Sequence, residues 1–223
     1  MSTALRYRDR DRRATKCARY GTSGAMSRDK WNRRYSETER LWQADPTPEL
    51  KRVVDGMAPG RALDLAAGEG RNALYLAESG WHVTAVDFSD VAVGRGRERS
   101  QELGLQVTWE VADLTEYEPA HGHFDLVCIC YLQIPWPEMS RVVTAAAGAV
   151  RPGGTFLVVG HDRSNLTHGV GGPQYPEVLY TPEDVVGLLS GFAIDRAEQA
   201  RNPVDHGPEE GTQIDCVVVA HRR

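Results

Sequence analysis

The sequence lacks long hydrophobic runs, has few cysteines and carries no excess of positive charge. Its most apolar uncharged runs, around residues 126–134 and 142–150, are much shorter than the roughly 18 residues of a membrane-spanning helix, so we expect no membrane segment. The 4 cysteines are too few and too scattered for a secreted disulfide framework, and no apolar signal-peptide core follows Met1. These absences indicate a cytoplasmic protein. The net charge of −5 argues against a dedicated nucleic-acid surface.

The chain divides into a polar extension and one domain. Its 223 residues, 41% of them hydrophobic, suffice for one sizeable core. Residues 1–25 carry many arginines and almost no large apolar side chains, so they cannot bury enough surface to offset the entropy of ordering. We therefore expect a disordered basic extension over 1–25 and a folded domain over 26–223. A basic arm for RNA or phosphate and an Arg-rich transit peptide are the alternatives for the extension, and Asp9 and Asp11 weaken the second.

Beyond residue 26, short β-rich runs alternate with helical runs, and Gly or Pro stands at the joints. This alternation is typical of a parallel sheet covered by helices. The expected strands are 61–65, 82–86, 107–111, 124–130, 155–160, 192–199 and 213–220. The expected helices begin at Pro48, at Arg71, after Ser89 or Asp90, at Pro137 as first helical position and after Thr181 as N-cap.

The strongest chemical signal is the loop after the first expected strand, Asp64-Leu65-Ala66-Ala67-Gly68-Glu69-Gly70. Glycines between a strand and a helix let the backbone approach a ligand, and the helix start offers unpaired N–H groups. A polar or anionic ligand is therefore expected there. Asp87 ends the second strand, where a carboxylate can accept hydrogen bonds from both hydroxyls of a ribose. Asp113 follows the third strand at the same edge of the sheet and can accept from an adenine amino group, so the pattern predicts an adenosine ligand.

Taken in order, these motifs resemble the class I S-adenosylmethionine-dependent methyltransferases over roughly residues 31–220. The markers are Asp64-x-Ala-x-Gly68-x-Gly70, Asp87, Asp113, the Phe124-Asp125 strand start and Arg151-Pro152-Gly153-Gly154. Trp31-x-x-x-Tyr35 and the run from Gly70 to Ala77 resemble, more narrowly, the small-molecule branch of tellurite-resistance and thiopurine-type methyltransferases. The sequence departs from the family at Ala66, where glycine is usual, and the alanine methyl group is expected to crowd the methionine moiety.

The resemblance implies a three-layer, Rossmann-like α/β sandwich with a seven-stranded, mostly parallel sheet whose last two strands form an antiparallel hairpin. It also implies S-adenosyl-L-methionine as the cofactor and a small-molecule methyl acceptor, with an S, Se, Te, O or N nucleophile left open. The residues expected to bind the cofactor are Trp31, Tyr35, Asp64, Ala66, Gly68, Gly70, Asn72, Asp87, Phe88, Ser89, Asp113, Leu114, Cys130 and Tyr131.

His161 leaves the fifth expected strand at the same edge, and imidazole titrates near neutrality, so it is the candidate general base for a hydroxyl or amine acceptor. Cys128 and Cys130 share a strand face, but no histidine stands at ligand spacing from them, and we expect no metal. The oligomeric state stays open between monomer and homodimer.

Two other functions fit the same loop. A nicotinamide-dependent oxidoreductase also uses a glycine turn, but the sequence has no Tyr-x-x-x-Lys pair and no sixth strand–helix repeat. A domain that binds S-adenosylmethionine without turnover is the non-enzymatic alternative, and the alanines at 66 and 67 keep it open.

Overall fold

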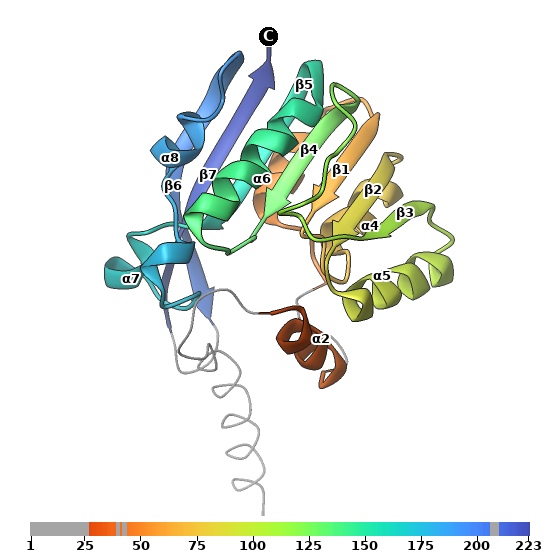
Figure 1. Cartoon of the computed structure of the whole chain (residues 1–223), viewed down its shortest axis with the longest axis horizontal. Coiled ribbons are helices and arrows are strands. Elements are labelled where there is room, and N and C mark those ends of the chain that lie inside the picture. Colours follow the sequence, from red (N-terminus) through yellow and green to blue (C-terminus); the bar gives the residue numbers. More distant parts are fainter. Residues whose placement is uncertain (1–26, 39–40, 42–43, 206–209) are drawn as a thin grey trace, which may run out of the picture.

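A computed structural model describes residues 27–38, 41, 44–205 and 210–223, and the expected extension over 1–25 lies outside these residues. The described chain forms one seven-stranded sheet in the order β3-β2-β1-β4-β5-β7-β6 (Figure 1). The strands are β1 (Arg61–Leu65), β2 (His82–Asp87), β3 (Val107–Val111), β4 (Phe124–Cys130), β5 (Val150–His161), β6 (Phe192–Asp205) and β7 (Glu210–Arg222). Strands β1 to β5 pair in parallel, while β7 runs antiparallel to both β5 and β6. The predicted fold class is confirmed.

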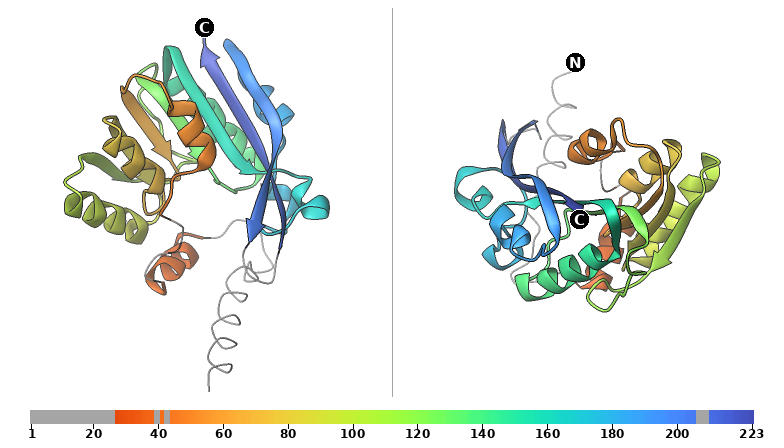
Figure 2. Two further views of the ribbon diagram at one scale, coloured as in Figure 1. Left: turned by 180° about the vertical axis from the view of Figure 1, so that it is seen from behind. Right: turned by 90° about the horizontal axis from the view of Figure 1, so that it is seen from above.

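Helices cover both faces of the sheet, so the central strands are apolar on both sides. On one face α3 (Pro48–Val54), α4 (Arg71–Glu78) and α5 (Asp90–Glu102) pack on a core that includes Ala62, Leu126 and Leu157. On the other face α6 (Trp136–Ala149) and α8 (Pro182–Val186) pack on a core that includes Leu63, Val127 and Phe156. Figure 2, seen from behind, shows α3 in orange against the face opposite to α6. None of the described helices is long and apolar enough to cross a membrane.

Three further elements lie near the carboxyl ends of the parallel strands. They are α2 (Arg28–Ser36), α7 (Asn165–His168) and the 3-10 helix η1 (Pro176–Val178). Figure 1 shows α2 below the carboxyl ends of the parallel strands and α7 beside the β6–β7 pair. Ligands of open α/β sheets bind at this edge, so these elements and the strand ends frame the candidate site.

Side-chain caps set several helix boundaries. Ser89 caps α5 by accepting a hydrogen bond from the Ala92 backbone N–H at 3.1 Å, as one of the two predicted caps. Thr181 caps α8 in a capping box with Asp184, as predicted. Helix α6 begins at Trp136, so Pro137 occupies its second position rather than the predicted first.

The last strands are longer than the sequence indicated. The prediction ended one strand at Gln199 and began the next at Gln213, but pairing continues to Asp205 and Glu210. Pro203 lies in this extension, opposite Thr212. A proline, which has no backbone N–H to donate, is tolerated there because β6 is the edge strand of the described sheet and pairs on one side only. The hairpin therefore projects past the carboxyl end of β5, which ends at His161, and forms a wall beside the site (Figure 1).

Candidate functional site

Asp87 organises the loop between β1 and α4. Its carboxylate accepts hydrogen bonds from the Gly68 N–H at 2.8 Å and from the Ser89 N–H at 2.9 Å. The side chain is buried, which raises the pKa of Asp87, while the backbone donors of Ser89 and Gly68 oppose that shift. The Ala112 N–H binds the Asp87 carbonyl at 3.1 Å, so the segment carrying Asp113 and Leu114 lies beside it. The structure thus brings the predicted ribose and adenine residues together.

The loop itself contains a strained alanine. Ala66 has φ +61°, in the left-handed region that disfavours residues with a Cβ, and Gly68 and Gly70 also have positive φ. The sequence departure at Ala66 therefore falls where glycine is the unstrained residue. Gly70 has a second reason to lack a side chain, because a Cβ there would lie 2.2 Å from Cη2 of Trp109.

Asp64 is a buried carboxylate near the end of β1, just before this loop. Its Oδ1 accepts from the Cys128 Sγ at 3.4 Å, and its Oδ2 has no hydrogen-bond partner among the described residues. Burial raises the pKa of Asp64 to about 7, with Asp87 adding to the rise, and with Cys128, Arg71 and the backbone of Ala73 opposing it. A buried acceptor without a donor is costly, so this oxygen fits a ligand that brings a cation or an N–H group.

Other predicted cofactor residues hold the frame of the site. Asn72 is buried and accepts from the Thr47 N–H at 2.8 Å, which ties α4 to the segment before α3. The Ser89 hydroxyl lies 2.6 Å from Oδ1 of Asn32, and the Asn32 amide donates to Asp90 at 2.7 Å. These contacts dock α2 on the N-terminus of α5.

The remaining predicted residues differ in exposure. Trp31 and Tyr35 on α2 have ring centroids 5.7 Å apart, and Tyr35 is buried. Phe88 is half-buried and Leu114 is buried, whereas Asp113 is exposed and accepts from the Thr115 N–H at 2.9 Å.

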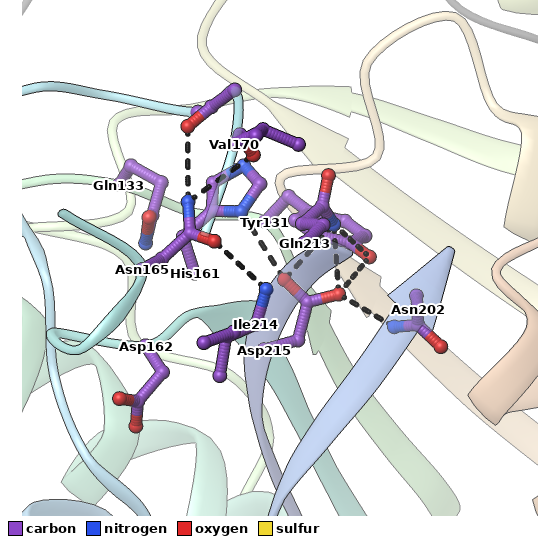
Figure 3. A network of polar contacts seen from close by, with 12 residues as sticks. Tyr131, Gln133, His161, Asp162, Asn165, Val170, Asn202, Gln213, Ile214 and Asp215 are labelled. Carbon is purple, nitrogen blue, oxygen red and sulfur yellow. Dashed lines mark hydrogen bonds and ion pairs between the residues drawn. The ribbon is translucent and has the colours of Figure 1, made fainter. Parts of the chain in front are cut away.

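A second polar cluster lies where β4 and β5 end beside β7, and it is centred on the buried Asp215 (Figure 3). His161 Nδ1 lies 3.2 Å from Oδ1 of Asp215, and the Tyr131 hydroxyl donates to Oδ2 at 2.9 Å. Gln213 donates to both oxygens, at 3.0 and 2.8 Å, and Asn202 donates to Oδ2 at 3.0 Å. Asn202 lies in a segment that the sequence analysis assigned to a loop, and Gln213 lies at the first position of an expected strand.

Tyr131 links the two halves of the site. It follows Cys130 at the end of β4 with φ +62°, one of two described non-glycine residues in the left-handed region. Its ring lies 5.2 Å from the His161 ring, and the Arg71 guanidinium lies 5.5 Å from its centroid. Burial and the neighbouring Asp215 raise the pKa of the Tyr131 phenol well above its ordinary value, so the hydroxyl stays protonated and donates. Strain of this kind is common at functional sites.

Sequence reasoning found His161 and Tyr131 but missed Asp215, Asn202, Gln213 and Arg71. An acid between Ile214 and Cys216 in an apolar strand was the available signal for Asp215, because a buried carboxylate requires donors. Among the described residues, no group of three or more His, Cys, Asp or Glu side chains is arranged to hold a metal ion.

Comparison with known proteins agrees with this geometry. The family model described as a methyltransferase domain matches residues 62–154. A ubiquinone biosynthesis O-methyltransferase of Aromatoleum aromaticum is 32% identical over 135 residues, 54% of this chain and 57% of that protein. One of Thiobacillus denitrificans is 30% identical over 158 residues, 64% of this chain and 68% of that protein. The chain spans 57% of the length of the Aromatoleum protein, and 58% and 66% of the length of two other curated methyltransferases.

Solved structures match in fold. TehB from Haemophilus influenzae superposes with a TM-score of 0.69 at 15% identity, covering 88% of this chain and 67% of that one. An S-adenosylmethionine dependent methyltransferase from Mesorhizobium loti gives a TM-score of 0.64 at 22% identity, over 78% and 96% of the chains. At these identities both matches support the fold alone. From the fold, the loop and the relatives together, the chain belongs to the class I S-adenosylmethionine-dependent methyltransferases.

Proposed function

We propose that this protein transfers the methyl group of S-adenosyl-L-methionine to a small-molecule acceptor. The observation that carries the proposal is the buried Oδ2 of Asp64, which makes no hydrogen bond with the described residues and lies near the end of β1, just before the Ala66–Gly70 loop. S-adenosylmethionine brings an ammonium and a sulfonium, which a buried carboxylate favours. The pyrophosphate of a nicotinamide cofactor is anionic, and the unpartnered carboxylate of Asp64 beside this loop opposes it.

The remaining contacts follow from the family resemblance and from where the residues lie. Asp87 would hold the ribose hydroxyls, Asp113 the adenine amino group, and Phe88 and Leu114 the two faces of the adenine ring. Gly68 and Gly70 would cradle the methionine part, with Trp31, Tyr35 and Tyr131 as aromatic neighbours of the positive sulfur. Cys130 would line the same edge, while Asn72 and Ser89 support it through Thr47 and Asn32.

When bound, S-adenosylmethionine supplies an electrophilic methyl group on a positive sulfur. The protein's task is then to align the acceptor with that methyl, and alignment alone can contribute several kcal/mol. Helix α2, residues 131–135, residues 161–180 and the β6–β7 hairpin would enclose the acceptor. His161 is the proposed general base for an acceptor that must lose a proton.

The names of relatives span several acceptors. One is a 2-heptyl-1-hydroxyquinolin-4(1H)-one methyltransferase of Mycobacteroides abscessus, and another is a phosphatidylethanolamine N-methyltransferase of Cereibacter sphaeroides. We extend to this chain only the class of small-molecule acceptor. The proposal includes a cytoplasmic location, which the free thiols of Cys128, Cys130 and Cys216 support, and a monomer or homodimer as the working state.

The test combines binding and turnover. Asp87→Ala should weaken binding of S-adenosylhomocysteine at least tenfold in titration calorimetry, because ribose and loop contacts are lost together. Glu102→Ala removes an exposed carboxylate from the far end of α5 and serves as the matched control. An unchanged Kd in Asp87→Ala contradicts the proposed site. Transfer of labelled methyl from S-adenosylmethionine to a panel of phenols, alcohols, amines and thiols then separates an enzyme from a binding domain, which would give no product.

A further inference from the structure

Asp215 is enclosed by donors. The carboxylate is fully buried, and the side chains of His161, Tyr131, Asn202 and Gln213 converge on it (Figure 3). Such an arrangement stabilises an ionised carboxylate, which can only accept hydrogen bonds. His161 Nδ1 is therefore the donor in its contact with Oδ1 of Asp215.

This contact determines which nitrogen of His161 can accept a proton. In a neutral imidazole one ring nitrogen donates and the other accepts, so an Nδ1–H donor leaves the lone pair on Nε2. Nε2 makes no hydrogen bond with any residue that the structure describes, and the side chain is 13% exposed. The His161 ring lies next to the Tyr131 ring and close to Gly172, where an added Cβ would lie 3.0 Å from the imidazole.

The surrounding backbone also fixes the pair. His161 and Asp215 face each other as partners of the β5–β7 ladder. Asn165 accepts from the Ile214 N–H at 2.8 Å and donates to the Gly171 carbonyl at 3.0 Å, which ties the loop after β5 to β7 next to Asp215. The strained backbone of Tyr131 places its hydroxyl on the same carboxylate.

We propose that Asp215 is a positioning residue that holds His161 with its proton on Nδ1, so that Nε2 takes the proton of a hydroxyl acceptor. This inference rests on the proposed function and narrows its acceptor to alcohols or phenols. The acceptor oxygen forms the new bond to the methyl carbon, and the electron pair of the broken carbon–sulfur bond stays on sulfur. The O–H proton moves to Nε2, and the Asp215 carboxylate stabilises the resulting imidazolium. A thiol or selenol that is already an anion needs no such base.

The isosteric variant Asp215→Asn should reverse the tautomer. Oδ2 of Asp215 accepts hydrogen bonds from three side chains, Tyr131, Asn202 and Gln213, whereas Oδ1 accepts from His161 and more weakly from Gln213. The amide oxygen will therefore occupy the Oδ2 position, and the amide NH2 will face His161. Nδ1 then accepts, the proton moves to Nε2, and the base is lost although the fold is kept.

Nitrogen-15 NMR of histidine-labelled full-length protein without ligands tests this directly, with His161→Gln to assign the signals. We expect the wild-type neutral ring to be predominantly Nδ1–H, and the ratio of Nδ1–H to Nε2–H to fall at least about tenfold in Asp215→Asn. A wild-type ring that is predominantly Nε2–H overturns the proposal even if the variant does not fold. An unchanged ratio in a folded variant overturns it as well.

Two sets of acceptors, one of phenols and alcohols and one of thiols, test the substrate class. Wild-type protein should methylate members of a set of phenols and alcohols, and Asp215→Asn should lower that rate about 100-fold or more while changing kcat rather than KM. Methylation of thiols alone, or an equal loss on both sets, overturns the inference. Methylation of amines but of no phenol, alcohol or thiol also overturns the inference and leaves the proposed function in place. Methylation of no acceptor of any class contradicts the proposed function itself.

Discussion

Replacing Ala66 by glycine should stabilise the protein, although glycine usually weakens a fold. Ala66 has φ +61°, and the left-handed conformation costs an L-residue roughly 1–2 kcal/mol. Glycine removes that cost but adds about 0.4–1 kcal/mol of unfolded-state entropy. The net change is an increase of about 0.5–1 kcal/mol in the free energy of unfolding, or about 1–4 °C in Tm for a chain of this size.

The adjacent Ala67 provides the matched control. It is buried at 8% exposure and is not one of the described non-glycine residues with positive φ. Ala67→Gly therefore loses a buried methyl and gains only unfolded-state entropy, so it should destabilise by about 1–2 kcal/mol. Urea unfolding of both variants measures the two signs. Destabilisation of Ala66→Gly by as much as Ala67→Gly would refute the strain at Ala66.

Two further predictions concern α5 and Asp64. A Cβ at Gly96 would lie 2.3 Å from Trp109, so Gly96→Ala should lower the free energy of unfolding by about 1–3 kcal/mol. A Cβ at Gly94 would meet nothing within 4 Å, so Gly94→Ala should raise it by about 0.5–1 kcal/mol. Equal effects of the two substitutions in urea unfolding would contradict the Trp109 contact. Because burial raises the folded-state pKa of Asp64 to about 7, the folded chain keeps a proton that the unfolded chain releases above about pH 4, and the free energy of unfolding falls as pH rises from about 4 to 7. The free energy of unfolding of Asp64→Asn lacks this fall, so the difference between the variant and wild type should grow by about 3 kcal/mol as pH rises from 5 to 8. A parallel pH dependence of the two proteins would argue against a buried acid at this position.

Local signals in the sequence predicted most of the fold. The apolar runs of β1 and β4, the Ser89 cap and the Thr181 capping box each act within a few residues, so they are legible without tertiary information. The placement of Asp87 and Asp113 at the carboxyl edge of the sheet follows from the alternation of strands and helices.

The parts that escaped prediction depend on distant partners. Pro203 and Gly211 indicated a loop, but the hairpin extends through both. The edge strand β6 tolerates Pro203, and Gly211 lies on β7 beyond the last residue that pairs with β5. Asp215 acquires its role only when β7 pairs with β5 beside His161. Gly70 was assigned to the ligand alone, whereas its approach to Trp109 on β3 is a packing requirement that only the folded chain shows.

The most direct measurement is titration calorimetry of the full-length protein with S-adenosylhomocysteine and, separately, with NADH. The buried, unpartnered carboxylate of Asp64 beside the loop predicts micromolar binding of S-adenosylhomocysteine and no binding of NADH. Binding of NADH alone would contradict the proposed site and assign the loop to a nicotinamide cofactor instead.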